Sequence, residues 1–125
     1  MAAPNIVSVT SIYGKTSYLT PANTTANVLL ANAASSGTVL KINQIVASNI
    51  DGLNAVEVTV AINTAADGTG TSFPIVSTAY VPADTSLVAV DKTTSIYLEE
   101  GTSIVVTSGT ASKISYTVSY EVISA

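Results

Sequence analysis

The pattern of apolar and polar residues is clearest near the end of the chain, over residues 114–122. Ile, Tyr and Val occupy every second position there, and Ser, Thr and Glu occupy the positions between them. Because successive side chains of a strand point to opposite faces of its sheet, this alternation predicts a strand with one buried face. Residues 55–62 have the same period and predict a second such strand, with Glu57 and Thr59 outward. Its inward side chains would be Val56, Val58, Val60 and Ile62.

Shorter segments rich in Val, Ile, Thr and Leu predict further strands. Gly, Pro, Asn and Asp turn signals separate them at short intervals, including Gly14-Lys15, and residues 91–94 are expected to be a tight polar loop. Residues 27–34 have no clear period, but a strand is favoured there because every neighbour is a strand. The other predicted strands are residues 6–13, 38–48, 87–90, 95–98 and 103–107.

Many short strands between regular turn signals are typical of an all-β sandwich or barrel. The sequence therefore predicts a single antiparallel β-sandwich, of jelly-roll or immunoglobulin-like type, with no substantial helix. A chain of 125 residues is long enough to bury a core as one domain. We expect residues 1–125 to form that domain, with residues 1–9 as an extended N-terminal arm, because Pro4 is tolerated at the start or edge of a strand.

The composition argues against most kinds of active site. The chain has no Cys and no His, so it lacks disulfides, thiolate nucleophiles and the usual general base near neutral pH. Four basic residues face eight acidic ones, whereas a nucleic-acid surface needs clustered Lys or Arg. No apolar run reaches the roughly 18 residues of a membrane span, and we expect no secretion signal. We therefore expect no enzyme, no catalytic, cofactor-binding or metal-ligating residues, no cofactor, and no nucleic-acid or membrane partner.

The low charge leaves two possibilities for the surface of the protein. Charged residues make up 10% of the chain, well under the usual fraction of about 25%. Either the exposed faces are rich in Ser, Thr and Ala, or neighbouring subunits cover much of the surface.

Two acidic stretches are candidate sites. Glu99 and Glu100, in YLEEGTSIVV, are adjacent carboxylates, but neighbouring strand residues point to opposite faces and do not converge on one substrate bond. With Gly101 after them they are expected to be solvated charges at a hairpin bend. Asp67-Gly68-Thr69-Gly70 resembles a cation loop but lacks the further acids that calcium needs, so it is expected to be a flexible, projecting loop tip.

Aromatic and N-terminal residues are the better candidates for an interface. Tyr116 and Tyr120 share the apolar face of the last predicted strand and should be core. Tyr is also favoured at protein interfaces, where its ring buries area and its hydroxyl stays wet. The candidate interface residues are Pro4, Ile6, Tyr13, Tyr18, Phe73 and Tyr97.

Three long stretches carry a family resemblance. They are MAAPNIVSVTSIYGKT, NAASSGTVLKINQIVASNIDGLNAVEVTV and VPADTSLVAVDKTTSIYLEEGTSIVV. Together, in this order, they resemble the small virion-associated structural proteins of tailed phages of marine cyanobacteria. The resemblance implies a component of a phage particle, made in the host cytoplasm, with phage capsid or tail proteins as partners. It carries no catalytic residues.

Two classes of function follow from these observations. The first is a capsid decoration or cement protein that acts as a homo-oligomer and stabilises the head, or else a tail, neck or fibre-associated subunit. The second is a host-attachment or carbohydrate-binding module, although such modules usually present exposed aromatic residues and Trp is absent here.

Overall fold

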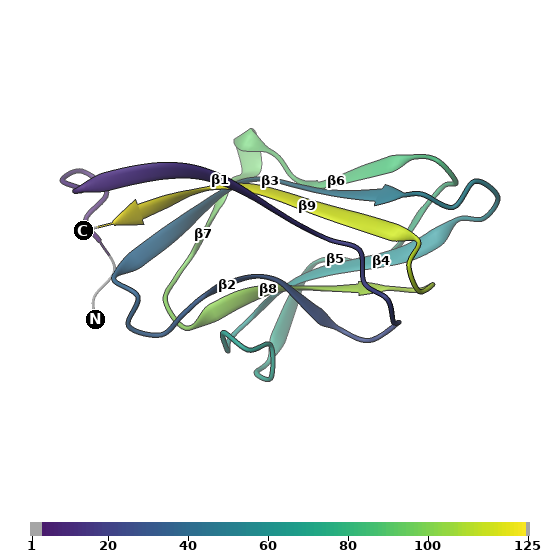
Figure 1. Cartoon of the computed structure of the whole chain (residues 1–125), viewed down its shortest axis with the longest axis horizontal. Coiled ribbons are helices and arrows are strands. Elements are labelled where there is room, and N and C mark those ends of the chain that lie inside the picture. Colours follow the sequence, from purple (N-terminus) through teal and green to yellow (C-terminus); the bar gives the residue numbers. More distant parts are fainter. Residues whose placement is uncertain (1–3, 125) are drawn as a thin grey trace.

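The computed structural model describes residues 4–124, which form nine β-strands and one short 3₁₀ helix (Figure 1). The helix, η1, spans Lys92–Thr94 and is capped by Asp91, whose side chain accepts hydrogen bonds from two backbone amides. The strands are β1 (Ser11–Leu19), β2 (Asn27–Asn32), β3 (Thr38–Asn49), β4 (Val56–Asn63), β5 (Ser72–Val81), β6 (Ser86–Val90), β7 (Ile96–Leu98), β8 (Thr102–Ser108) and β9 (Ile114–Ser124).

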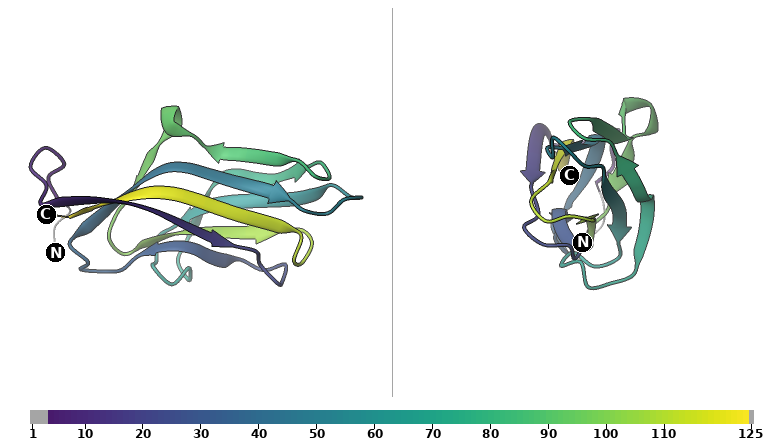
Figure 2. Two further views of the ribbon diagram at one scale, coloured as in Figure 1. Left: turned by 45° about the horizontal axis from the view of Figure 1, so that its top comes forward. Right: turned by 90° about the vertical axis from the view of Figure 1, so that its right-hand side faces the viewer.

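The strands form two antiparallel sheets that pack face to face, as the end-on view in Figure 2 shows. Sheet A has the order β1-β9-β3-β6, with β7 also paired to β3, and sheet B has the order β2-β8-β4-β5. The pairs β1–β9, β2–β8, β3–β6 or β7, and β4–β5 are nested within one another along the chain. One long antiparallel hairpin wrapped into two sheets is a jelly roll, which confirms the predicted all-β sandwich.

The core lies between the inner faces of the sheets. In the last strand Tyr116 and Val118 are fully buried and Tyr120 is nearly so, as the alternation predicts. The hydroxyl of Tyr116 donates to the carbonyl of Thr107, 2.9 Å away, and lies 3.0 Å from the hydroxyl of Ser108. Because Tyr116 belongs to sheet A and its partners belong to sheet B, this side chain ties the two layers together.

The predicted strand over residues 6–13 is misplaced. The first strand begins at Ser11 and runs to Leu19, in register with β9 over its whole length. Gly14 and Lys15 lie inside this strand and form no turn. Nine ladder positions with β9 outweigh the turn preference of Gly14-Lys15, because tertiary pairing overrides local propensity.

The described part of the N-terminal segment is a turn. The backbone carbonyl of Asn5 accepts from the amide of Ser8, and its side chain accepts from the amide of Val7. The amide of Thr10 then donates to the carbonyl of Ser124 at the end of β9. Over these residues the segment bends beside its own sandwich and is not an extended arm; residues 1–3 of the predicted arm lie outside the described residues.

Two features were not expected from the sequence pattern. Strand β5 has no simple alternation, since Pro74 lies within it and Thr78 has a φ of 45°, with two register shifts against β4. The segment 91–94 joins β6 to β7 as predicted, but it is a helical turn, and both of these strands pair with β3. It therefore interrupts one edge of sheet A.

Candidate functional site

The two adjacent carboxylates lie where the chain crosses from sheet A to sheet B. Glu99 is exposed, whereas Glu100 is half-buried, with its Oε2 atom 3.3 Å from the amide of Gly37 and its Oε1 atom buried without a hydrogen-bond partner. Gly101, at a φ of 76°, turns the chain and donates to the carbonyl of Asn32. The expected hairpin bend is wrong, because β7 and β8 belong to different sheets. The expected solvated charge is found at Glu99 but not at Glu100, which is half-buried.

The loop over residues 64–71 folds back onto the outer face of sheet B. The hydroxyl of Ser103, on β8, donates to the carbonyl of Ala65 in the loop at 2.7 Å. A Cβ placed on Gly68 would lie 3.0 Å from Val28 and 3.3 Å from Val105, two residues paired on that outer face. Val105 is therefore only 4% exposed although it faces away from the core. The expected projecting loop tip is wrong, because this loop covers its own sheet.

A buried asparagine holds that loop. Asn63, at the end of β4, donates from its side chain to the carbonyl of Gly70 and the hydroxyl of Ser72. Its Oδ1 atom accepts from the amides of Ala65 and Gly70. A Cβ at Gly70 would meet the backbone amide of Ala65 at 2.9 Å, so only glycine fits this close approach. The side-chain amide supplies donors and acceptors that the loop backbone lacks.

Buried asparagines at the ends of two more strands also hydrogen-bond to backbone groups. Asn32 donates to the carbonyls of Thr38 and Leu98, and Asn49 donates to those of Asn54 and Val81. Sequence reasoning missed these asparagines. A signal for them exists, because each ends an apolar strand and is followed within five residues by a glycine: Gly37, Gly52 and Gly68.

The outer face of sheet A is open by contrast over its central rows, although Val39 and Ile123, which pair at one end of this face, are each only 5% exposed. Cross-strand pairing places Tyr18, Thr117, Val46 and Val88 in one row across the sheet. A parallel row contains Gly14, Glu121, Lys41 and Tyr97. Tyr18 is 78% exposed, Val88 50% and Tyr97 48%. This surface, called the A face below, is a broad pleated area with only one acidic and one basic residue in these two rows.

The six candidate interface residues do not form one patch. Tyr18 and Tyr97 both lie on the A face. Tyr13 is exposed and lies on β1, as Tyr18 does, but its side chain is on the inward side of that strand. It pairs with Val122, which packs against the core. The others are scattered: Pro4 is buried, Ile6 is in the N-terminal turn, and Phe73 is on β5 at the far edge of sheet B.

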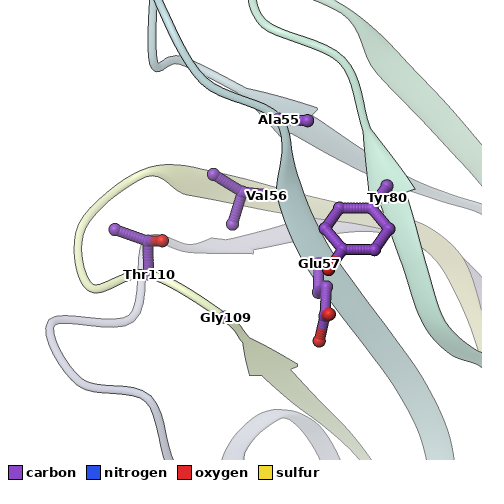
Figure 3. A pocket seen from close by; sticks show the side chains of 6 residues that line it. All are labelled: Ala55, Val56, Glu57, Tyr80, Gly109 and Thr110. Carbon is purple, nitrogen blue, oxygen red and sulfur yellow. The ribbon is translucent and has the colours of Figure 1, made fainter.

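A small depression of about 230 Å³ lies beside β4 and β5 (Figure 3). Glu57 and Tyr80 are directly opposite each other on these strands, and the turn at Gly109-Thr110 closes one side. A hydrogen bond to the Glu57 carboxylate, together with its charge, raises the pKa of Tyr80 above its usual value. Tyr80 is exposed, and Glu57 is partly exposed.

All four sheet edges carry features that hinder pairing with another strand. Strand β5 has Pro74 and register shifts, and β2 has a register shift between Val28 and Leu30. Helix η1 interrupts the β6/β7 edge. On β1, Lys15 pairs with the core residue Tyr120, so a charge lies on the inward side of an edge strand. Bulges, prolines and inward charges on edges oppose edge-to-edge association.

Within residues 4–124, no group of three or more acidic side chains could hold a metal ion. No helix in that range is long and apolar enough to cross a membrane.

Comparison with known proteins shows solved structures with a similar fold. No family model and no curated protein matches the chain. A subunit of Bacillus endospore appendages, described as disulfide-linked pili, superposes with a TM-score of 0.51 at 18% identity, over 91% of this chain and 86% of that one. A protein of the T13 IBDV viral particle superposes with a TM-score of 0.51 at 10% identity, over 94% of this chain and 32% of that one. At these identities the likeness shows a shared fold, and this chain has no Cys with which to form a disulfide link.

Proposed function

We propose that this chain is a non-catalytic structural subunit of a viral particle, and specifically a capsid decoration protein of a tailed phage that binds the assembled head. The observation that carries the proposal is the jelly-roll sandwich. Over nearly its whole length, this chain superposes on a protein of a viral particle and on a pilus subunit. Both of those proteins belong to assemblies of repeated subunits.

The surface agrees with such a role. Charged residues make up only 10% of the chain, and the A face presents Tyr, Val, Ser and Thr side chains that can pack against a neighbour. The guarded sheet edges favour a discrete contact over open-ended strand addition. A tail, neck or fibre-associated subunit is the alternative within the same class.

The test is the position and copy number of the chain in purified particles. Mass spectrometry should find the protein in stoichiometric amounts, and a reconstruction should place it outside the head shell. Density at the tail or neck would favour the alternative. Absence from particles would overturn the structural role altogether.

One observation favours a second function, the binding of a saccharide. Tyr80 is 69% exposed beside Glu57, and an aromatic ring next to a carboxylate can stack on a sugar and accept hydrogen bonds from its hydroxyls. A glycan array tests this idea. The idea is supported if the parent binds a glycan and Tyr80→Ser abolishes that binding. It is wrong if the parent binds no glycan on the array.

A further inference from the structure

The A face differs from the rest of the surface in being both open and weakly charged. Residues 64–71 cover part of the outer face of sheet B, and the sheet edges are guarded. In contrast, Tyr18, Val88 and Tyr97 extend from the A face into solvent over three of its strands.

We propose that the A face binds the A face of a second copy of this chain, about a two-fold axis parallel to the strands and between β3 and β9. The inference deepens the proposed function and rests on it, because it takes another copy as the partner. Two-fold association brings identical patches together, so residue i meets residue j and residue j meets residue i.

Charge complementarity identifies this axis. Lys41 on β3 and Glu121 on β9 are direct cross-strand neighbours. The Glu121 carboxylate is held by the side-chain amide of Asn43, at 3.1 Å. Rotation about the proposed axis places β3 over β9 of the second copy at the same height. Lys41 then meets Glu121 of the second copy, and the reciprocal contact forms as well. An axis perpendicular to the strands would not oppose these charges.

Size complementarity points to the same axis. Tyr97 and Gly14 are at the two ends of the Lys41–Glu121 row, so the rotation brings Tyr97 over Gly14 of the second copy. Apart from Gly14 and its two neighbours in the chain, no described residue has a heavy atom within 4 Å of the place where a Cβ of Gly14 would be, which leaves room for a ring. In the next apolar row Tyr18 meets Val88 of the second copy by the same rotation.

Helix η1 rises beside this face (Figure 1), and a hollow of about 310 Å³ lies between it and the sheet. Its lining includes Gln44 and Ser119, which share the row next to Tyr18. On the proposed axis this hollow faces β1 of the second copy. It gives space for that strand's side chains where η1 would otherwise limit the approach.

The face approaches the size that a specific dimer interface needs. Four strands about 4.8 Å apart and about eight residues long, at roughly 3.3 Å each, have a projected area of about 500 Å². The accessible area of a pleated surface with protruding side chains exceeds its projection, and a standard interface takes about 800 Å² from each partner.

Charge reversal tests the contact in solution. Lys41→Glu and Glu121→Lys should each raise the dimer dissociation constant at least about tenfold in sedimentation equilibrium, because each opposes like charges. The double reversal should bring the constant back to within about threefold of the parent value, since it restores opposite charges. Glu57→Lys is the matched control, since it makes the same charge change on sheet B and should have no effect. Thermal melting of each variant checks folding. If a charge reversal fails to fold, Tyr18→Ser on the A face should weaken the dimer, and Tyr80→Ser on sheet B should not.

Cross-linking tests the geometry, because the parent chain has no Cys. Gly14→Cys and Tyr97→Cys proteins, mixed and oxidised, should give a covalent heterodimer, whereas neither should cross-link efficiently alone. If the parent dimerises but both charge reversals leave its dissociation constant unchanged, the inference is overturned. It is also overturned if the parent dimerises but the two Cys variants give no covalent heterodimer. Either result leaves the proposed function standing. A parent that remains monomeric at about 1 mM also overturns the inference. The presence of the chain in particles decides the proposed function separately.

Discussion

The two outer faces of the sandwich show how one fold can give opposite surfaces. On sheet B, residues 64–71 return over β8, and the hydroxyl of Ser103 binds the loop backbone. On sheet A, no contact of this kind is recorded across the central rows of the described chain, and Tyr18 and Tyr97 remain exposed. Ser, Thr and Val residues are present on both faces, so these residue types alone do not distinguish them. The difference comes from a single loop and the asparagine that holds it.

The largest effect is expected where the two sheets share a core. Val118→Asp should unfold the domain, because it buries a carboxylate without a partner at a cost of several kcal/mol. Ser119→Asp changes the next residue of the same strand, on the A face, and should keep a cooperative melt. Circular dichroism melting curves make the comparison. A native-like curve for Val118→Asp would contradict the assignment of inward and outward positions.

The next effect sharpens the contrast between the faces. Asn63→Ala removes three hydrogen bonds to the loop and one to Ser72 of β5, and it should destabilise the protein by roughly 2 to 4 kcal/mol, because buried polar groups lose their partners. Hydrogen exchange should rise over residues 64–71. Asn43→Ala, near the A face, removes one bond to Glu121 and should cost about 1 kcal/mol or less. Equal effects in the two variants would mean that the loop is not held by Asn63.

A smaller effect should come from the tie between the sheets. Tyr116→Phe keeps the buried ring but removes the hydroxyl that donates to Thr107 and contacts Ser108, so we expect a loss of about 1 to 2 kcal/mol in the free energy of unfolding. Tyr97→Phe alters an exposed hydroxyl and is the control, with a change below about 0.5 kcal/mol. Urea unfolding measures both. No loss for Tyr116→Phe would show that the tie is not needed.

Acid pH should act on both faces. A hydrogen bond from the Thr69 side chain lowers the pKa of Asp67 in the sheet B loop, and one from the Thr93 side chain lowers the pKa of Asp91 at η1. A lowered pKa in the folded state gives stability that is present above the unfolded value of about 3.9 and lost as the pH falls through the folded value. The melting temperature should therefore decrease as the pH is lowered below about 4. Asp67→Asn and Asp91→Asn should each flatten this fall, and an unchanged profile in both would assign it to other carboxylates.

The smallest effect is expected at the crossover between the sheets. Glu99→Gln should change stability by less than about 0.5 kcal/mol, because the side chain is exposed. Glu100→Gln should change it by roughly 1 kcal/mol or less, since its Oε2 atom binds the amide of Gly37. Chemical denaturation of the two single variants separates them. A large loss in Glu99→Gln would reveal a contact that its exposure does not suggest.

The fold could be predicted from the sequence wherever one side of a strand is buried and the other is wet. Alternation located β9 and β4 to within a few residues, because each buries one face against the core. It did not single out β5, whose edge position leaves nearly all of its side chains exposed. It also misplaced β1, whose limits are set by pairing with β9 and not by local preference.

The surface was harder to predict, because it depends on contacts between distant parts of the chain. Asp67 was expected at a projecting tip, and the bonds of Asn63 that fold the loop back leave no periodic signal. Tyr18 and Tyr97 were both named as interface candidates, yet their common face arises from the register of β1, β9, β3 and β7. Lys41 and Glu121 were not among the interface candidates, since their alignment exists only in the folded sheet.

The nested pairing of the strands has a consequence for the time the protein needs to fold. Thr16 and Ser119, which share a hydrogen bond in sheet A, are 103 positions apart in the chain. Strands with such distant partners must close very long loops before any pairing is gained, and proteins of this kind fold in milliseconds to seconds. During that interval β3 and β8 are expected to have open edges that the finished sandwich covers. The inward Lys15 and the proline of β5 would then oppose pairing between incompletely folded chains before β9 has joined its sheet.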